Sequence, residues 1–337
     1  MNLLITGGCG FIGANVIHHL IERPEVLLLV NLDALTYAAD PANLGVIPAH
    51  PKYRFEHTDL RDQPAVAEVV ARHGITHVLH LAAESHVDRS ITGPDAFIHT
   101  NVVGTMNLLE ACRAAWAGAW EGRRFLHVST DEVYGSLGDT GAFTENSPCA
   151  PSSPYAASKA AADLLVRAYH RTYGFPAVIT NCGNNFGPYQ HAEKLIPVII
   201  ASVCARRPIP LYGDGAQVRD WIFARDHAEA LWQVLTRGRI GETYNIGARC
   251  ERTNRALAEQ ICDLVDELAP ELGGNSCQLI SQVADRPGHD RRYAIDPSKL
   301  ERELGWKAQA SFPDALRETV RWYLAQRERS DSTRRGA

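Results

Sequence analysis

Five short apolar runs alternate with segments of helical periodicity in the first half of the chain. The runs lie at 3–5, 26–32, 78–81, 125–129 and 177–181. Continuous apolar runs of this length are typical of parallel strands that are buried on both faces, with a helix making each connection. We therefore predict an α/β fold built on a doubly wound parallel sheet with right-handed crossovers. In such a sheet, ligands bind at the carboxyl ends of the strands.

Charge and cysteine content limit the partners of the chain. Its 337 residues carry a formal net charge of −5, so no global positive field attracts nucleic acid or an anionic membrane surface. The eight cysteines form no CxxC pair and the histidines lack zinc-ligand spacing, which argues against a metal site. The first residues do not resemble a secretion signal, and the longest apolar run, 26–30, is too short to span a bilayer. We expect a cytoplasmic protein with free thiols and no membrane partner.

A glycine-rich segment follows the first apolar run. In TGGCGFIG, at 6–13, Gly7, Gly10 and Gly13 stand between an expected strand and an expected helix. Small residues here let backbone N–H groups approach a pyrophosphate, which the start of the helix also stabilises. Asp33 lies 20 residues after Gly13, where a carboxylate can accept hydrogen bonds from ribose hydroxyls and repel a 2′-phosphate. The segment favours NAD over NADP; the alternative is a tight turn with a surface aspartate.

Tyr155 and Lys159 are four residues apart and share one face of an expected helix. An unperturbed tyrosine has a pKa of about 10, so a tyrosine that acts as a base near neutral pH needs a cation that favours its phenolate. Lys159 and an oxidised nicotinamide can provide this charge. The pair alone is also typical of a solvated helix face, but Ser129 and Thr130 end an expected strand, where a hydroxyl can join Tyr155 in a hydrogen-bonded group.

Two adjacent carboxylates, Asp131 and Glu132, follow Thr130. On a regular strand they would face opposite sides of the sheet, so both can serve one substrate only where the strand ends. Their position after the run at 125–129 allows this arrangement. Two carboxyl groups held close together do not ionise equally, so one can stay protonated as an acid while the other acts as a base. An ordinary acidic loop is the alternative.

Longer motifs resemble one family of enzymes. They are HLAAESHVDRS at 80–90, STDEVYG at 129–135, SPY at 153–155, TNC at 180–182, EKLIP at 193–197, RDW at 219–221 and DRPGHDRRY at 285–293. Together they resemble the dTDP-glucose 4,6-dehydratases of the extended short-chain dehydrogenase/reductase superfamily, over nearly the whole chain. The resemblance implies an NAD-dependent nucleotide-sugar 4,6-dehydratase, a nucleotide-diphosphate hexose substrate and a homodimer.

The resemblance also implies roles for individual residues. Tyr155 is the base for oxidation at C4, supported by Lys159 and Thr130, while Asp131 is the acid at the C6 hydroxyl and Glu132 the base at C5. The residues expected to bind NAD are Gly7, Gly10, Phe11, Ile12, Gly13, Asp33, Thr36, Asp59, Leu60, Leu81, Ala82, Ala83, Ser85, Thr100, Tyr155 and Lys159. Those expected to bind substrate are Ser85, Thr130, Asn184, Lys194, Leu195, Pro210, Tyr212, Arg219, Asn254, Arg286 and His289. No residue is assigned to a metal.

The alternation of strand and helix weakens after residue 182. Turn-rich stretches at 184–189 and 212–215 and a Pro/Gly break at 286–288 indicate a second, smaller region. We predict a Rossmann-type NAD-binding domain formed mainly by 1–182, with a later contribution from about 218–247. A smaller α/β nucleotide-sugar-binding region is expected mainly at 183–326, and the charged segment 327–337 is expected to be frayed.

Departures from the family pattern lie on the substrate side. Gly183 and Phe186 stand where Ser and Tyr are more common in the family, and Gln190, His191 and Ala192 replace a different short loop. The connection between residues 135 and 143 is also short. The sequence therefore leaves the nucleotide base open between dTDP and UDP, CDP or GDP.

Two other classes of protein share parts of this pattern. A 4-epimerase or a UDP-xylose-forming decarboxylase shares the glycine segment, Tyr155 and Lys159, but needs no Asp131-Glu132 pair. A nucleotide-sensing protein without turnover does not need the catalytic set. The carboxylate pair favours dehydration, because oxidation at C4 makes the C5 hydrogen acidic, so that Glu132 can remove it while Asp131 protonates the departing C6 hydroxyl.

Overall fold

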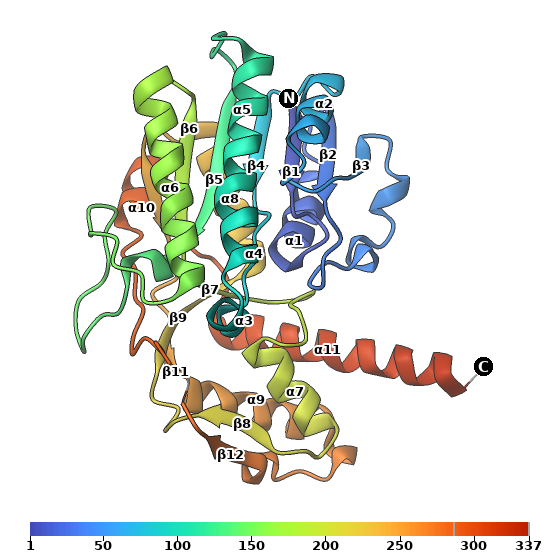
Figure 1. Ribbon diagram of the computed structural model, residues 1–337. Helices are drawn as coiled ribbons and strands as arrows, with labels where there is room; N and C mark the ends of the chain where they lie inside the picture. The colour runs from blue at the N-terminus through green and yellow to red at the C-terminus, as the bar shows by residue number, and fades with distance from the viewer. Residues whose placement is uncertain (286, 336–337) are drawn as a thin grey trace.

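A seven-stranded parallel sheet forms the centre of the computed structural model, which describes residues 1–285 and 287–335 (Figure 1). Its strand order is β10-β6-β5-β4-β1-β2-β3. The strands are β1 (Asn2–Thr6), β2 (Leu28–Asp33), β3 (Tyr53–His57), β4 (His77–His80), β5 (Arg124–Thr130), β6 (Ala177–Cys182) and β10 (Thr243–Ile246). The direction of the chain across the sheet reverses between β1 and β4, and at such a switch point parallel sheets open a crevice for ligands.

The five apolar runs coincide with β1, β2, β4, β5 and β6, so the expected α/β class is confirmed. The sequence reading did not identify β3 as a strand. This strand lies at the edge of the sheet, and only Tyr53 of its five residues is buried. An edge strand exposed to solvent needs no apolar run, so Arg54 and Glu56 interrupt the pattern. The last strand, β10, lies inside the segment 218–247 that was expected to return to this domain.

Helices cover both faces of the sheet. On one face lie α1 (Phe11–Leu20), α8 (Ala224–Arg237) and α10 (Ser298–Leu304), and on the other α2 (Gln63–Arg72), α5 (Gly104–Trp116) and α6 (Pro154–Tyr173). Strand β1 shows how one strand serves both layers. Leu3 and Ile5 pack into the first core and Leu4 into the second, because successive side chains of a strand point to opposite faces.

A second region carries its own core. It contains a three-stranded sheet of β11 (Glu251–Thr253), β9 (Val218–Phe223) and β7 (Asn184–Phe186), and a two-stranded sheet of β12 (Ile280–Val283) and β8 (Ile209–Tyr212). Helices α7 (Leu195–Cys204), α9 (Asn254–Leu268) and α11 (Phe312–Arg335) pack with these strands (Figure 1). Helix α11 extends to Arg335 and so includes most of the charged segment 327–337, whose fraying stays a prediction. Residues 336 and 337 lie outside the described part of the chain.

Short helices lie in the connections between these elements. They are α3 (Val87–Thr92), α4 (Asp95–Phe97), the π-helix η3 (Ile98–Val103) and the 3-10 helices η1 (Pro41–Leu44), η2 (Ile47–Ala49), η4 (Asp131–Tyr134), η5 (Pro270–Leu272) and η6 (Ser276–Leu279). Of these, η4 begins at the residue after β5, so the strand ends where the sequence places the carboxylate pair. Within residues 1–285 and 287–335, no helix is both long and apolar enough to cross a membrane.

Candidate active site

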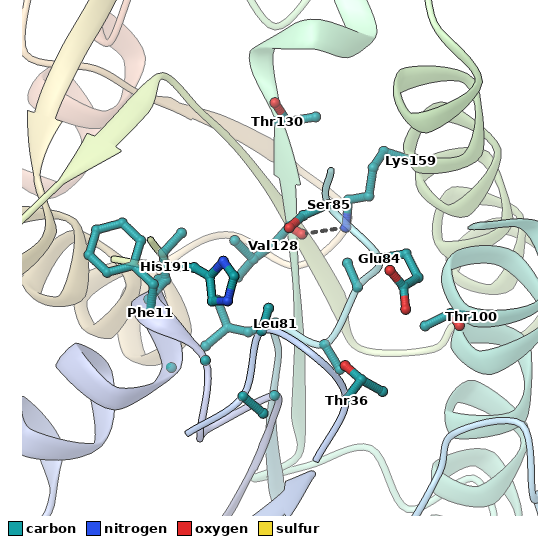
Figure 2. A pocket seen from close by; sticks show the side chains of 18 of the residues that line it. Phe11, Thr36, Leu81, Glu84, Ser85, Thr100, Val128, Thr130, Lys159 and His191 are labelled. Atoms are coloured by element: carbon teal, nitrogen blue, oxygen red, sulfur yellow. Dashed lines mark hydrogen bonds between the residues drawn. The ribbon is translucent and has the colours of Figure 1, made fainter. Parts of the chain in front are cut away.

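A cavity of about 360 Å³ opens at the carboxyl ends of β1, β2, β4 and β5 (Figure 2). Its wall contains the glycine-rich segment after β1, Asp33 at the end of β2, the residues that follow β4 and the start of η4. Side chains at the start of α6 line the same cavity. The site therefore lies at the switch point of the sheet, where the fold class predicts it.

The glycine-rich segment brings the backbone close to this cavity. Gly7 has a φ of +73°, and a Cβ there would lie 2.8 Å from the Cα of Ala82. A Cβ on Gly13 would lie 2.1 Å from the carbonyl oxygen of Gly7. Helix α1 begins at Phe11, and no side chain caps its first N–H groups. Glycine is thus required by the packing, and the unpaired N–H groups fit the pyrophosphate of a dinucleotide.

Asp33 is held rigidly at the end of β2. Its Oδ2 accepts a hydrogen bond from the Cys9 N–H at 2.9 Å, and its Oδ1 accepts one from the Leu35 N–H at 2.8 Å. Burial raises the pKa of Asp33, while these two N–H groups oppose the shift. The carboxyl group is therefore oriented toward the cavity before any ligand binds, as recognition of a ribose requires.

We expect Asp33→Ala to weaken NAD binding by roughly ten- to a hundred-fold, the effect of losing a hydrogen bond to a charged group. Isothermal titration of the apoprotein with NAD measures this change. The substitution also removes the acceptor of two backbone N–H groups, so some loss of stability is expected too. Asp40→Ala is the matched control and should keep NAD affinity, because Asp40 also accepts a backbone N–H, from Ala42, but does not line the cavity. An NAD affinity unchanged by Asp33→Ala would exclude Asp33 from the cofactor site.

Tyr155 and Lys159 lie on the buried side of α6. Ser153 caps this helix by accepting the Ala156 N–H at 3.1 Å, which fixes the first turn that carries Tyr155. Lys159 Nζ donates to the carbonyl oxygen of Val128 at 2.8 Å (Figure 2). The expected helix and shared face are thus observed, and both side chains line the cavity.

The surroundings of Tyr155 decide when it ionises. Burial raises its pKa well above the ordinary value, and the charges of Glu132 and Asp131 raise it further, while a hydrogen bond with Thr130 opposes the shift. Burial also lowers the pKa of Lys159. Tyr155 can therefore act as a base near neutral pH only when positive charge stands close to it.

The carboxylate pair lies where β5 turns into η4. The Thr130 hydroxyl accepts the Glu132 N–H at 3.3 Å and so caps this turn. Because the strand has ended, Asp131 and Glu132 both line the cavity instead of facing opposite sides of the sheet. The sequence analysis required this arrangement if Asp131 and Glu132 were to act on one substrate.

Asp131 has the surroundings of an acid. Its side chain is 2% exposed, and its Oδ2 has no hydrogen-bond partner among the described residues. Burial raises its pKa well above the ordinary value, Glu132 raises it further, and Arg219 opposes the shift. These surroundings favour the protonated form of Asp131 and leave one oxygen free to meet a ligand.

The structure brings together all the residues expected to bind NAD and all five expected to carry catalysis, since every one of them lines the cavity. The residues expected to bind substrate fall into two groups. Ser85, Thr130, Asn184 and Lys194 line the cavity, whereas Leu195, Pro210, Tyr212, Arg219, Asn254 and His289 are outside its wall. Arg286 lies outside the described residues. The six outlying residues lie in the second region, and their roles in binding substrate stay predictions.

Three of the outlying residues lie near the catalytic centre or near each other. Arg219 is close enough to Asp131 to influence its pKa, and its guanidinium stacks 4.2 Å from the ring centre of Tyr293. His289 contacts Tyr212 edge to face, with ring centres 6.1 Å apart.

The sequence reading missed several residues that line the cavity, of which Glu84, Arg61, His191 and Glu193 are charged or titratable. Asn101 was also not predicted from the sequence. From the π-helix η3 it accepts the Glu84 N–H at 2.8 Å and donates to the Ser158 hydroxyl at 2.9 Å, joining the loop after β4 to α6. The available signal was an Asn followed directly by two valines in a helical segment, because an amide that is buried needs hydrogen-bond partners.

Comparison with known proteins identifies the family. Residues 4–319 match the family model described as GDP-mannose 4,6 dehydratase. The chain is 50% identical to dTDP-glucose 4,6-dehydratase 1 of Escherichia coli K12, over 100% of this chain and 96% of the relative. The chain belongs to the dTDP-glucose 4,6-dehydratase family. Another member, from Xanthomonas campestris pv. campestris B100, is 53% identical over 95% of this chain and 92% of the relative.

Solved structures of this family have the same fold as this chain. DesIV, a dTDP-glucose 4,6-dehydratase from Streptomyces venezuelae solved with NAD bound, superposes with a TM-score of 0.89 at 47% identity, covering 97% of this chain and 98% of that one. A UDP-glucose 4-epimerase from Thermus thermophilus, also in complex with NAD, has a TM-score of 0.84 at 30% identity, covering 96% and 99%. The fold is thus shared by dehydratases and epimerases, so the site must distinguish them.

Proposed function

We propose that this chain is an NAD-dependent hydro-lyase that converts dTDP-glucose to dTDP-4-keto-6-deoxy-glucose and water. The observation that carries the proposal is the Asp131-Glu132 pair beside Tyr155 and Lys159 in one cavity. The family members with about half of their residues identical bear the same activity in their names. A UDP-, CDP- or GDP-hexose is the alternative substrate, because the departures from the family pattern lie on the substrate side.

The first step is oxidation at C4. Tyr155 removes the proton of the C4 hydroxyl, with Thr130 as its hydrogen-bond partner and Lys159 as the nearby cation. When bound, NAD supplies a hydride acceptor that is regenerated in each cycle, so the hydrogen taken from C4 is later returned to C6. The Gly7–Gly13 backbone and Asp33 would hold its pyrophosphate and ribose. The resulting C4 ketone makes the neighbouring C5 hydrogen acidic.

The second step is elimination of water. Glu132 removes the C5 proton, and Asp131 donates its own proton to the C6 hydroxyl, which leaves as water. Asp131 suits this role because burial raises its pKa, which favours the protonated form, and because its Oδ2 has no partner in the described structure. Return of hydrogen to C6 and of a proton to C5 then completes the product, with no external reductant consumed.

A product assay tests the proposed function. The purified protein is incubated separately with dTDP-, UDP-, CDP- and GDP-glucose, without added cofactor, and the products are analysed by mass spectrometry. We expect loss of one water from dTDP-glucose and a 4-keto product, with no net release of NADH. An unchanged mass together with a 4-epimer would instead identify an epimerase. Dehydration of UDP-glucose in preference to dTDP-glucose would retain the reaction and change the substrate.

We also propose a homodimer in the cytoplasm. The outer surface of α3, η3, α5 and α6 carries the exposed apolar side chains Ile91, Ile98, Met106 and Leu164, a grouping that suits contact with a second copy. All eight cysteines are free thiols, as suits a reducing compartment.

We expect Leu164→Glu to convert the dimer to a monomer, because it places a charge in the centre of this apolar surface. Light scattering coupled to gel filtration measures the mass. Leu27→Glu is the matched control, because Leu27 is as exposed but lies between α1 and β2. Equal masses for the wild-type protein and Leu164→Glu would contradict this interface.

A further inference from the structure

The buried face of α6 carries a third ionisable side chain. Asp163 follows Lys159 at the same spacing of four residues that separates Lys159 from Tyr155, and it is 1% exposed. Asp163 does not line the cavity, so substrate does not reach it. A carboxylate at this depth is costly unless it has hydrogen bonds and a nearby cation.

Consecutive residues of β5 hold both charged side chains. The carbonyl oxygen of Val128 accepts from Lys159 Nζ at 2.8 Å. On either side of it, Ser129 Oγ donates to Asp163 Oδ2 at 3.0 Å, and His127 Nε2 lies 3.2 Å from Asp163 Oδ1. His127 and Ser129 reach the same carboxylate because alternate residues of a strand share one face. Strand β5 therefore fixes Asp163 and Lys159 relative to each other.

The other groups that face Lys159 carry no charge. Burial lowers the pKa of His80 on β4 well below its ordinary value and also lowers that of His127, so both rings are neutral. Burial raises the pKa of Cys182 on β6 to about 12, so this side chain is a thiol. Among the described residues no direct ion pair forms on Lys159. Asp163 is the negative charge on the side of Lys159 away from the cavity.

Among the described groups around Asp163, Lys159 is the buried cation. Burial raises the pKa of Tyr134 on η4 and of Cys149, and the charge of Asp163 raises both further. Arg167 stands one helical turn beyond Asp163 and is partly exposed. Asn181 Nδ2 donates to Asp163 Oδ2 at 3.5 Å.

We propose that Asp163 is a positioning residue for C4 oxidation: its buried carboxylate is the counter-ion that keeps the Lys159 ammonium charged beside Tyr155. This inference rests on the proposed dehydratase function. Burial lowers the pKa of Lys159 and the charge of Asp163 opposes that shift. Because Tyr155 can ionise near neutral pH only beside a cation, the carboxylate at 163 controls the base without touching the substrate.

The pH dependence of the first step tests this role. Asp163→Asn keeps the size of the side chain and an oxygen that accepts from Ser129, but removes the negative charge. The pKa of Lys159 should then fall, so that Lys159 loses its charge at a lower pH than in the wild-type protein. A nearby opposite charge shifts a pKa by roughly 1–3 units, and the absence of direct contact favours the smaller effect. C4 oxidation is measured in a single turnover by the absorbance of the reduced nicotinamide. The alkaline limb of its pH profile should move down by about one pH unit.

Two further variants separate charge from packing. Asp163→Glu keeps the charge and should retain the alkaline limb of the wild-type protein. His127→Asn disturbs the contact with Asp163 without removing the carboxylate, so it should lower stability and leave the limb in place. A limb that stays at the wild-type pH in Asp163→Asn would overturn the proposal.

A stability cycle gives a second test that needs no substrate. Lys159→Met leaves Asp163 as a buried charge without its cation, so adding Asp163→Asn to that variant should raise the melting temperature. In the wild-type background the same substitution should lower it. Equal losses in both backgrounds, or failure of the double variant to fold, would overturn the counter-ion role. Because the cycle measures stability alone, it decides this role even if the chain forms no 4-keto product.

Discussion

Glu132→Gln and Asp131→Asn are expected to slow elimination by roughly 10²–10⁴-fold, the usual contribution of a positioned acid or base. Both changes keep the size of the side chain, so C4 oxidation by Tyr155 should continue. Reduced nicotinamide should therefore accumulate on the enzyme, visible as absorbance in a single turnover. Glu132→Gln should also suppress exchange of the C5 hydrogen with solvent deuterium, whereas Asp131→Asn should retain part of it because only departure of the hydroxyl is impaired.

The pH profile adds a check on Asp131. Its pKa is raised, so the protonated form needed at the C6 hydroxyl persists to higher pH than in an ordinary aspartate and is lost as the pH rises through that raised value. This dependence should disappear from elimination in Asp131→Asn, which cannot titrate. Asp139→Asn is the control, because it removes a carboxylate from the exposed 135–143 connection. Formation of 4-keto-6-deoxy sugar at the wild-type rate by both site variants would exclude the carboxylate pair and the dehydration mechanism with it.

Tyr155→Phe is expected to lower the rate of C4 oxidation by roughly 10²–10⁴-fold, because phenylalanine keeps the ring but cannot accept a proton. The reduced nicotinamide that accumulates in Glu132→Gln should then be absent, since the block comes one step earlier. The double variant Tyr155→Phe with Glu132→Gln should behave like Tyr155→Phe alone. Stopped-flow absorbance distinguishes these outcomes.

Tyr134→Phe is the matched control for this substitution. Tyr134 is also a buried tyrosine near the end of β5, and its hydroxyl donates to Asn245 Oδ1 at 2.8 Å without lining the cavity. Its loss should reduce stability by about 1 kcal/mol and leave C4 oxidation intact. Normal absorbance of reduced nicotinamide in Tyr155→Phe would show that another group is the base.

The catalytic side of the site could be predicted because its residues follow local rules. A strand ends, and the next residues enter the crevice; this alone places Gly7, Asp33 and Asp131 at one edge of a parallel sheet. The spacing of four residues on a helix places Tyr155 and Lys159 together. Each of these inferences needs only the period of a strand or helix and the rule that parallel strands end at the same edge.

The substrate side could not be located in the same way. Arg219 and His289 belong to segments far apart in the chain, and neither lines the cavity, although Arg219 lies near Asp131. Their distance from the site depends on how the second region packs against the sheet. No local period encodes that packing, because it is set by contacts between residues far apart in the chain.

The sequence by itself determined the α/β class, five strands of the central sheet, the glycine segment and, through the family resemblance, the five residues expected to act on the substrate. Only the tertiary structure decided their ionisation and their partners. The pKa of Asp131 rises because folding buries it beside Glu132, as the proposed acid requires, and the role proposed for Asp163 arises because β5 holds it near Lys159. Burial depends on every element that packs around a group, and the free energy of a charge depends on that burial.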